Sequence, residues 1–420
     1  MRFLAALASV AIALLLSAPP ASADGGLTMV ADINPSGSSA PTNFMEMGGV
    51  AYFSATDGVT GRELWRSDGT STGTWLVRDI HHGSASSNPQ PIAVVGSVLY
   101  FTAKDRAHGQ ELWKTDGTAA GTHLVKDLVP GALSGGFIYG GVVVGNLLFF
   151  YLDLDVPGTW VSDGTDAGTY LVGPGLDYMT AFGDRLYGIH NNHLWRSDGT
   201  VSGTKRVGWE TRRVWDLGAT DNLLYLMSGD GKHCDLYVTD GTKSDVRRLT
   251  AQPVEGCQFA VAGQRVFFTN GHHEIWRSDG TARSTKLVST LTTDMWELWP
   301  SEDCVWFNTW DEEGYPAELW RSDGTKAGTV RIDATPLPDA SFVVSAGSLY
   351  YFAATSIDWS SEPTTTLYLW QSDGTAAGTT QVVNIDTQGS ATQELTAAGE
   401  RVFFWFDDGV HGAELWSYGP

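Results

Sequence analysis

The chain has 420 residues and carries 26 Lys and Arg against 48 Asp and Glu, a formal net charge of −22. Such a polyanion repels phosphate backbones, which excludes a nucleic-acid partner. Apolar residues make up 42% of the chain and charged residues 18%, so the chain can bury a large core. The 49 glycines and 17 tryptophans favour short strands joined by tight turns over a helical bundle.

Residues 1–23 have the pattern of a secretory signal peptide. The apolar run Phe3–Leu16 follows a positive residue, and the small residues at 21–23 suit signal peptidase. The run is too short for a membrane span. We therefore expect export, with a secreted or cell-surface domain over residues 24–420 and no membrane span after cleavage.

The mature part consists of copies of one unit, seen most clearly in Glu63–Thr70, ELWRSDGT. The string returns as ELWKTDGT from Glu111 and as ELWRSDGT from Glu318, and its copies recur about every 44 residues. This period is typical of four-stranded β-propeller blades. The aromatic residues at the Trp position are Trp65, Trp113, Trp160, Trp195, Tyr237, Trp276, Trp320, Trp370 and Trp416.

One unit predicts four strands. Residues 90–95 and 98–104 are apolar runs separated by Gly-Ser, residues 110–115 carry the ELW string, and residues 122–128 are the fourth strand.

The Asp-Gly-Thr string between the third and fourth strands has the chemistry of a turn. Asp accepts backbone N–H bonds, Gly adopts positive φ, and the Thr hydroxyl ties the loop. We interpret the repeated aspartates as structural turn residues rather than active sites: Asp68, Asp116, Asp163, Asp198, Asp240, Asp279, Asp323 and Asp373.

The two ends of the chain complement each other. Leu27–Ile33 matches a fourth strand with no strands before it, and Gln393–Trp416 supplies three strands with no fourth. An N-terminal strand that pairs with the last blade closes a ring and removes two open edges. The sequence thus predicts an all-β propeller of about nine blades in a single domain, with eight blades plus a degenerate unit as the alternative.

The repeated string resembles the signature of the bacterial ELWxxDGT repeat family of secreted and cell-surface proteins, over nearly all of the mature chain. The resemblance implies a propeller-like fold and an extracellular location, but no shared activity. Tyr237 in place of Trp, and Gly158-Thr159 in place of Glu-Leu, depart from the pattern. We expect those blades to be short or distorted.

A second resemblance concerns Ala55–Trp65, which is similar to the tryptophan-docking motif of quinoprotein dehydrogenase propellers. It implies packing between blades. It does not imply the quinone, because the adjacent cysteines of those enzymes are missing here.

The chain has three cysteines, too few for a disulfide framework. Cys234 and Cys257 lie in consecutive repeats and are the candidate pair, with Cys304 left over. Three free thiols are the alternative.

Carboxylates gather in the loops between second and third strands, on the face where propellers usually carry function. Asp57, Asp105 and Asp408 are weak candidate metal ligands there. We expect no cofactor, and calcium bound by these acids is the alternative. Alternatively such acids form a general acid and base pair, or simply a solvated rim.

An aromatic cluster in the seventh unit, followed by three acids and joined by a tryptophan in the longest insertion, is the candidate ligand site. Aromatic faces stack on sugar rings and carboxylates accept hydroxyl hydrogen bonds, although such tryptophans also pack between blades. The residues are Trp296, Trp299, Trp306, Trp310, Asp311, Glu312, Glu313 and Trp359.

Catalytic motifs for metalloprotease or phosphate chemistry are missing from the sequence. The hypothesis is a secreted, non-enzymatic binding or scaffold propeller that recognises an extracellular glycan or surface protein. The alternative is a glycan-active hydrolase or lyase that uses carboxylates at the mouth of the propeller.

Overall fold

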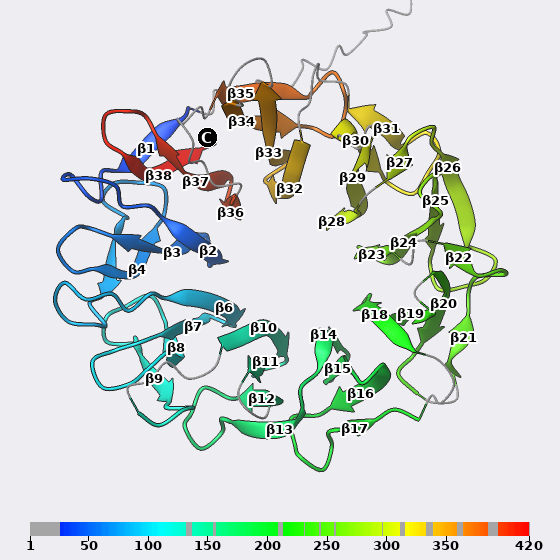
Figure 1. The fold of residues 1–420 in the computed structure, drawn as a ribbon, viewed down its shortest axis with the longest axis horizontal. Helices are drawn as coiled ribbons and strands as arrows, with labels where there is room; N and C mark the ends of the chain where they lie inside the picture. The colour runs from blue at the N-terminus through cyan, green and yellow to red at the C-terminus, as the bar shows by residue number, and fades with distance from the viewer. Residues whose placement is uncertain are drawn as a thin grey trace, which may run out of the picture.

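The computed structural model describes residues 26–131, 137–153, 157–208, 213–230, 232–242, 245–255, 258–295, 297–310, 316–332, 339–358, 364–384 and 394–419. Nine antiparallel sheets stand around a common axis and form a nine-bladed β-propeller (Figure 1). The predicted fold class is confirmed. Within these residues no helix is long and apolar enough to cross a membrane.

Most blades run outward from the axis in the order of their four strands (Figure 1). In blades 5 and 7 one strand lies off this path, and the outermost strand of blade 9 comes from the start of the chain. Blades 1 to 3 contain β2 (Thr42–Met47), β3 (Val50–Thr56), β4 (Arg62–Ser67), β5 (Trp75–Arg78), β6 (Gln90–Val95), β7 (Val98–Ala103), β8 (Glu111–Thr115), β9 (His123–Lys126), β10 (Phe137–Val144), β11 (Leu147–Asp153), β12 (Gly158–Ser162) and β13 (Tyr170–Pro174). Blades 4 to 6 contain β14 (Asp177–Phe182), β15 (Arg185–His190), β16 (His193–Ser197), β17 (Lys205–Arg206), β18 (Val214–Ala219), β19 (Leu224–Gly229), β20 (His233–Thr239), β21 (Arg247–Arg248), β22 (Val254–Glu255), β23 (Phe259–Ala262), β24 (Arg265–Asn270), β25 (Glu274–Ser278) and β26 (Lys286–Thr290). Blades 7 to 9 contain β27 (Asp294–Met295), β28 (Trp299–Ser301), β29 (Cys304–Trp310), β30 (Pro316–Ser322), β31 (Thr329–Ile332), β32 (Asp339–Ala346), β33 (Leu349–Asp358), β34 (Thr364–Ser372), β35 (Thr380–Asn384), β36 (Thr396–Ala398), β37 (Arg401–Asp407) and β38 (Ala413–Tyr418).

The ring is closed by its first strand. β1 (Thr28–Ala31) pairs antiparallel with β38, Thr28 opposite Ser417 and Met29 opposite Trp416, and completes the ninth blade. The two ends of the described chain therefore lie in one sheet, as the sequence predicts.

The core is divided into layers between neighbouring blades. Tyr52 and Leu64 of blade 1, for example, form one buried cluster with Leu99, Phe101 and Trp113 of blade 2. Alternating apolar residues on the second and third strands fill these layers, because both faces of each blade are covered by a neighbour.

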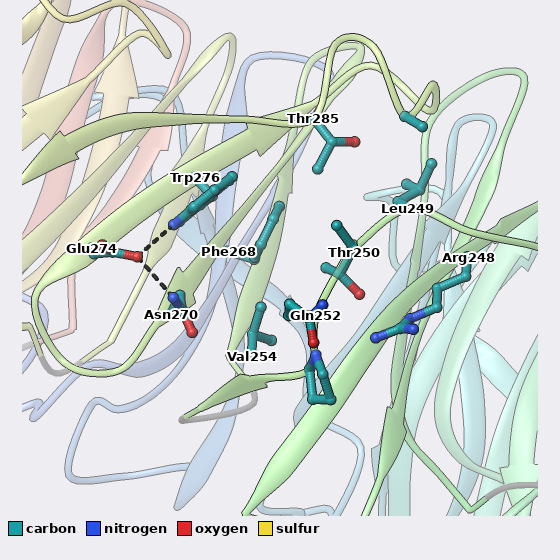
Figure 2. Close-up of a pocket in the computed structure, with 13 residues that line it drawn as sticks. Arg248, Leu249, Thr250, Gln252, Val254, Phe268, Asn270, Glu274, Trp276 and Thr285 are labelled. Carbon is teal, nitrogen blue, oxygen red and sulfur yellow. Dashed lines mark hydrogen bonds between the residues drawn. The ribbon is translucent and has the colours of Figure 1, made fainter.

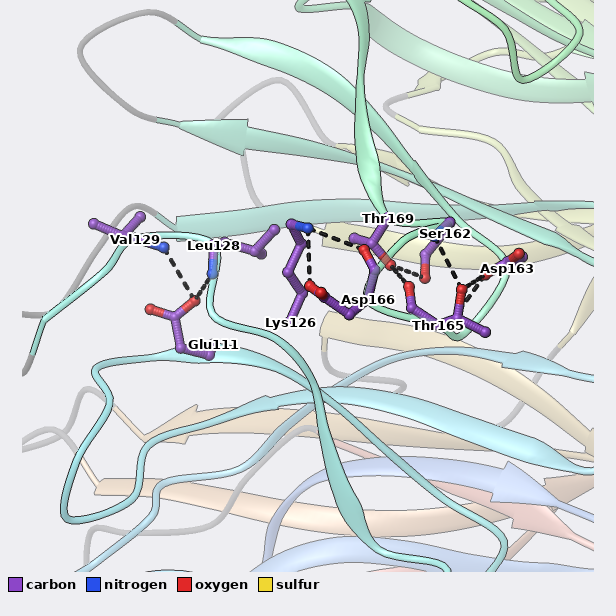
Figure 3. Close-up of polar contacts among 10 residues, drawn as sticks. Glu111, Lys126, Leu128, Val129, Ser162, Asp163, Thr165, Asp166 and Thr169 are labelled. Carbon is purple, nitrogen blue, oxygen red and sulfur yellow. Dashed lines mark hydrogen bonds and ion pairs between the residues drawn. The ribbon is translucent and has the colours of Figure 1, made fainter.

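The Asp-Gly-Thr turn is held by a closed set of hydrogen bonds, shown for blade 3 in Figure 3. Asp163 Oδ1 accepts the N–H of Thr165 at 2.8 Å and its hydroxyl at 2.7 Å. The Thr165 hydroxyl accepts the N–H of Gly168 at 2.9 Å, and Ser162 Oγ lies 2.7 Å from Thr169 Oγ1. The polar side chains of this Asp-Gly-Thr turn, Asp163 and Thr165, therefore both form hydrogen bonds within their own hairpin.

The same turn is also the contact to the preceding blade. Lys114 Nζ donates to the Gly164 carbonyl at 2.8 Å, and a Cβ on Gly164 would stand 2.3 Å from Tyr100 Oη. Lys126 Nζ, on β9, donates to both the carbonyl and the carboxylate of Asp166 (Figure 3). Lys114, the basic residue directly after the motif Trp113, and Lys126 are therefore both contacts between blades 2 and 3.

Candidate functional site

The motif glutamate is buried beneath the segment that leads to the next blade. Glu63 Oε1 accepts the Ser87 N–H at 3.0 Å, and its Oε2 accepts the Ser87 hydroxyl at 2.6 Å and the Ile80 N–H at 3.1 Å. Burial raises the pKa of Glu63. Glu111 Oε2 accepts the N–H groups of Leu128 and Val129 (Figure 3), and burial raises its pKa to about 7.

Blade 6 departs from this arrangement, because its motif glutamate is only partly buried. Glu274 Oε2 accepts the Asn270 side-chain N–H at 2.7 Å and the Trp276 indole N–H at 3.0 Å (Figure 2). Its Oε1 has no hydrogen-bond partner among the described residues. A carboxylate oxygen is thus left for a ligand.

Glu274 lines a cavity of about 560 Å³ between blades 5 and 6 (Figure 2). This volume lies within the range of small-molecule sites. Buried apolar side chains and an indole border a set of exposed or half-buried polar groups. The lining residues are Arg248, Leu249, Thr250, Ala251, Gln252, Pro253, Val254, Phe268, Asn270, Glu274, Trp276, Ala282 and Thr285.

The cavity lies at an irregular outer edge of blade 5. Its fourth strand, β21, has two residues, as β17 of blade 4 also does, whereas β5 and β9 have four. The chain then leaves the sheet edge and returns as β22, which pairs with β20 through Cys234 opposite Val254. Residues 249–254 form one wall of the cavity, where a longer fourth strand would lie.

The charge at the cavity is negative. Arg248 Nη2 lies 2.5 Å from Oδ1 of Asp235, which is only 2% exposed, so a buried acid already neutralises this guanidinium. Among the described residues no basic group pairs with Glu274. Apolar carbons, an indole, an amide and a carboxylate oxygen together suit a polyhydroxylated ring with one apolar face, and they disfavour an anion.

The predicted tryptophan site is not assembled as expected. Trp306 has no exposed surface and packs between blades 7 and 8, 5.0 Å from the Tyr350 ring centroid and 6.3 Å from that of Phe352. The prediction that Trp306 binds ligand is therefore wrong, because its ring belongs to the core. Trp299 lies opposite Trp306 and packs partly buried against the same cluster.

Trp310 ends β29 and is partly buried. The other expected members, Trp296, Asp311, Glu312, Glu313 and Trp359, lie outside the described residues.

The three loop aspartates cap turns. Asp57 Oδ1 accepts the N–H of Val59 at 2.8 Å and of Thr60 at 2.7 Å. Asp105 accepts N–H bonds two and three residues on, and so does Asp408. The backbone and side-chain bonds from His411 hold the pKa of Asp408 at about 2. In the described part of the chain, no three His, Cys, Asp or Glu side chains are grouped to hold a metal ion.

Of the cysteines, Cys234 is disulfide-bonded and Cys304 is a buried free thiol. Cys257, the expected partner of Cys234, lies outside the described residues.

Gly69–Gly73 has the spacing G-x-S-x-G of hydrolase nucleophile elbows. It lies in the hairpin between β4 and β5, where Asp68 accepts the Thr70 N–H and hydroxyl. A strand-to-helix elbow, which such a nucleophile needs, is therefore not formed here.

The cavity residues Arg248, Asn270 and Glu274 were not anticipated from the sequence. The available signal was the departure of the fifth copy from the motif, with Asp235 and Tyr237 in place of Glu and Trp.

Fold and site together define a nine-bladed propeller of motif repeats with a small cavity between two blades. No protein-family model and no curated protein matches the chain. Among solved structures it resembles the computationally designed Ika8 protein, at 13% identity and TM-score 0.48, over 78% of this chain and 95% of that one. It also resembles the dihydro-heme d1 dehydrogenase NirN, at 12% identity and TM-score 0.49, over 81% and 74% of the two chains.

A prolyl endopeptidase is similar at 9% identity and TM-score 0.45, over 81% of this chain and 55% of that chain. The chain thus spans about half the length of this peptidase. At these levels the similarities carry no argument about function.

Proposed function

We propose that the protein is an exported, non-enzymatic binding propeller that holds a neutral sugar residue of an extracellular glycan in the cavity between blades 5 and 6. The observation that carries this proposal is the cavity, at whose wall Glu274 accepts the Trp276 indole N–H through Oε2 while its Oε1 has no bond among the described residues. Export rests on the signal-peptide pattern of residues 1–23.

The chemistry of the lining supports a sugar over an apolar or an anionic ligand. Val254 and the Trp276 indole offer apolar contact, while Asn270 and Glu274 Oε1 offer bonds to hydroxyl groups. The charge of Glu274 disfavours acidic sugars. A hydrolase or lyase gains no support from Asp57, which uses one carboxylate oxygen for three bonds within its own turn.

The first experiment is a glycan-array screen of residues 24–420, with and without calcium, followed by a search for cleaved product. We expect saturable binding of neutral glycans that stay intact. Cleaved glycan would refute the non-enzymatic proposal. Calcium dependence would support the loop aspartates Asp57, Asp105 and Asp408 as calcium ligands. Binding only to surface proteins would show that the ligand class is wrong.

Blade 7 offers a matched control for the cavity. Trp320 donates its indole N–H to Glu318 at 3.0 Å and stacks on Phe307 at 6.4 Å between ring centroids, much as Trp276 bonds Glu274 and stacks on Phe268 at 6.0 Å. Trp276→Ala should weaken calorimetric affinity for the best array hit by about tenfold or more, whereas Trp320→Ala should leave it unchanged. Equal effects of both substitutions would show that Trp276 acts only through packing.

A further inference from the structure

Three tyrosines lie on the adjoining strands β10, β11 and β14 of blades 3 and 4, away from the cavity. Tyr139 is on β10 and Tyr178 on β14, both innermost strands facing the propeller axis (Figure 1), and Tyr151 is on β11 opposite Tyr139. Tyr139 is 53% exposed and Tyr178 is 61% exposed. Large aromatic rings so exposed on inner strands are not accounted for by the packing of blades.

Tyr178 stands in a backbone conformation that suits another residue type. Its φ is +49°, beside a register shift in β14. The inner strands of blades 1 and 3 have the same irregularity near their start, where Asn43 has φ +57° and Gly140 φ +59°. Asn and Gly adopt this region readily, whereas a bulky side chain does so at a cost. Since the Tyr178 side chain is largely exposed, burial does not offset that cost.

Tyr139 and Tyr151 are held in place by their surroundings. Their ring centroids are 6.4 Å apart. The Tyr151 ring lies against Gly175, where a Cβ would stand 2.3 Å from the ring carbon Cε2. His190 Nδ1 in turn lies 2.8 Å from the Gly175 carbonyl. The rings therefore rest on a fixed backbone.

Two exposed carboxylates accompany the rings. Asp153 follows Tyr151 by two residues on β11, and Asp177 directly precedes Tyr178 on β14. After burial, the charges of these two carboxylates are the main causes that raise the pKa of Tyr151. The strands of Tyr139 and Tyr178 are in contact, because a Cβ on Gly140 would lie 3.7 Å from Met179 Cε. Aromatic faces suit neutral sugar rings, and the neighbouring carboxylates can accept hydrogen bonds from sugar hydroxyl groups. The negative charge of these carboxylates disfavours uronic acids.

We propose that Tyr139, Tyr151 and Tyr178, with Asp153 and Asp177, form a second carbohydrate-binding surface that takes a linear neutral polysaccharide along the inner strands of blades 3 and 4. This surface uses no residue of the cavity and stands independently of the function proposed for it.

The test is calorimetric titration of cellohexaose, xylohexaose and chitohexaose, with hexagalacturonic acid as the acidic comparison, into residues 24–420 carrying Trp276→Ala. This background weakens binding in the cavity, and the tyrosine substitutions described next assign the remaining binding to the inner strands, whatever the outcome for the cavity. We expect at least one neutral hexasaccharide to bind and the acid not to bind. Absence of binding by every neutral hexasaccharide at millimolar concentration would overturn the proposal.

Tyr178→Asn introduces the residue found at the equivalent position in blade 1 and relieves the strained backbone. We expect affinity for the hexasaccharide to fall about tenfold while the melting temperature stays equal or rises. Tyr139→Ala should weaken binding similarly, whereas Tyr170→Ala, which removes an exposed tyrosine from the outer strand β13, should not. Unchanged affinity in both Tyr178→Asn and Tyr139→Ala would overturn the proposal. So would a sharp loss of stability in Tyr178→Asn.

Discussion

The motif glutamate has different environments in different blades, although its neighbours in sequence are alike. Glu63, Glu111 and Glu414 are buried and accept bonds from the segment that enters the next blade. Glu274 lacks this cover and borders the cavity. The role of each glutamate therefore depends on the chain that follows its blade rather than on the motif.

Glu111 predicts a pH dependence of stability. Its pKa is about 7 in the folded protein against an ordinary value of 4.5, so the folded state holds a proton that the unfolded state has released between these pH values. The stabilisation by protonated Glu111 is complete below pH 4.5 and is lost as the pH rises through 7, a change of about 3 kcal/mol. Glu111→Gln should remove this loss. The free energy of unfolding of the variant, relative to that of the wild type, should therefore increase from pH 5 to pH 8.

Urea unfolding at both pH values measures this change. Glu400→Gln, at an exposed position, is the control and should show no such trend. A free-energy difference between wild type and Glu111→Gln that stays constant over this range would contradict the assignment.

At the scale of the element, the hairpin after the motif Trp is specified by nearby residues alone. In blade 2, Asp116 accepts the Thr118 N–H and hydroxyl, and the Thr118 hydroxyl accepts the Gly121 N–H. All these bonds span at most three residues. Sequence reasoning can therefore identify the turn, because the bonding partners and the conformation are encoded together.

The second glycine of the hairpin is a stringent test of this arrangement. A Cβ on Gly121 would lie 2.0 Å from Asp116 Oδ1, so Gly121→Ala must break the Asp116 bonds or shift the loop. We expect a loss of about 2 to 3 kcal/mol in the free energy of unfolding. Gly37→Ala, whose Cβ would meet only Asn34 Nδ2 at 3.6 Å, is the control and should be nearly neutral in the same urea titration. Equal effects of the two substitutions would argue against the steric explanation.

At the scale of the molecule, the ring depends on one strand from the far end of the sequence. β1 pairs with β38, and Glu414 Oε1 accepts the Ser39 N–H at 2.9 Å while its Oε2 accepts the Ile33 N–H at the same distance. The closure thus combines strand pairing with a buried carboxylate. Without it, the β38 edge would offer unpaired backbone groups.

Removal of residues 26–33 should therefore open the ring. We expect the variant to associate through the β38 edge and to melt at least about 5 °C lower, as seen by light scattering after size-exclusion chromatography and by thermal unfolding. A synthetic peptide of residues 26–33, added in excess, should restore the monomer. A monomeric truncated variant with an unchanged melting temperature would show that the pairing contributes little.

The all-β class, the turn hairpins, the closing strand and a ring of eight or nine units could be predicted from the sequence, because each follows from a repeated local pattern or from its incomplete copies at the two ends. The structure fixed the number of blades at nine. Three features became visible only in the folded chain: Trp306 belongs to the core, Glu274 is uncovered, and Tyr139 and Tyr178 lie on neighbouring inner strands. These features depend on contacts between blades and on where the chain leaves a sheet edge. No local pattern records them, because the residues in contact belong to different repeats.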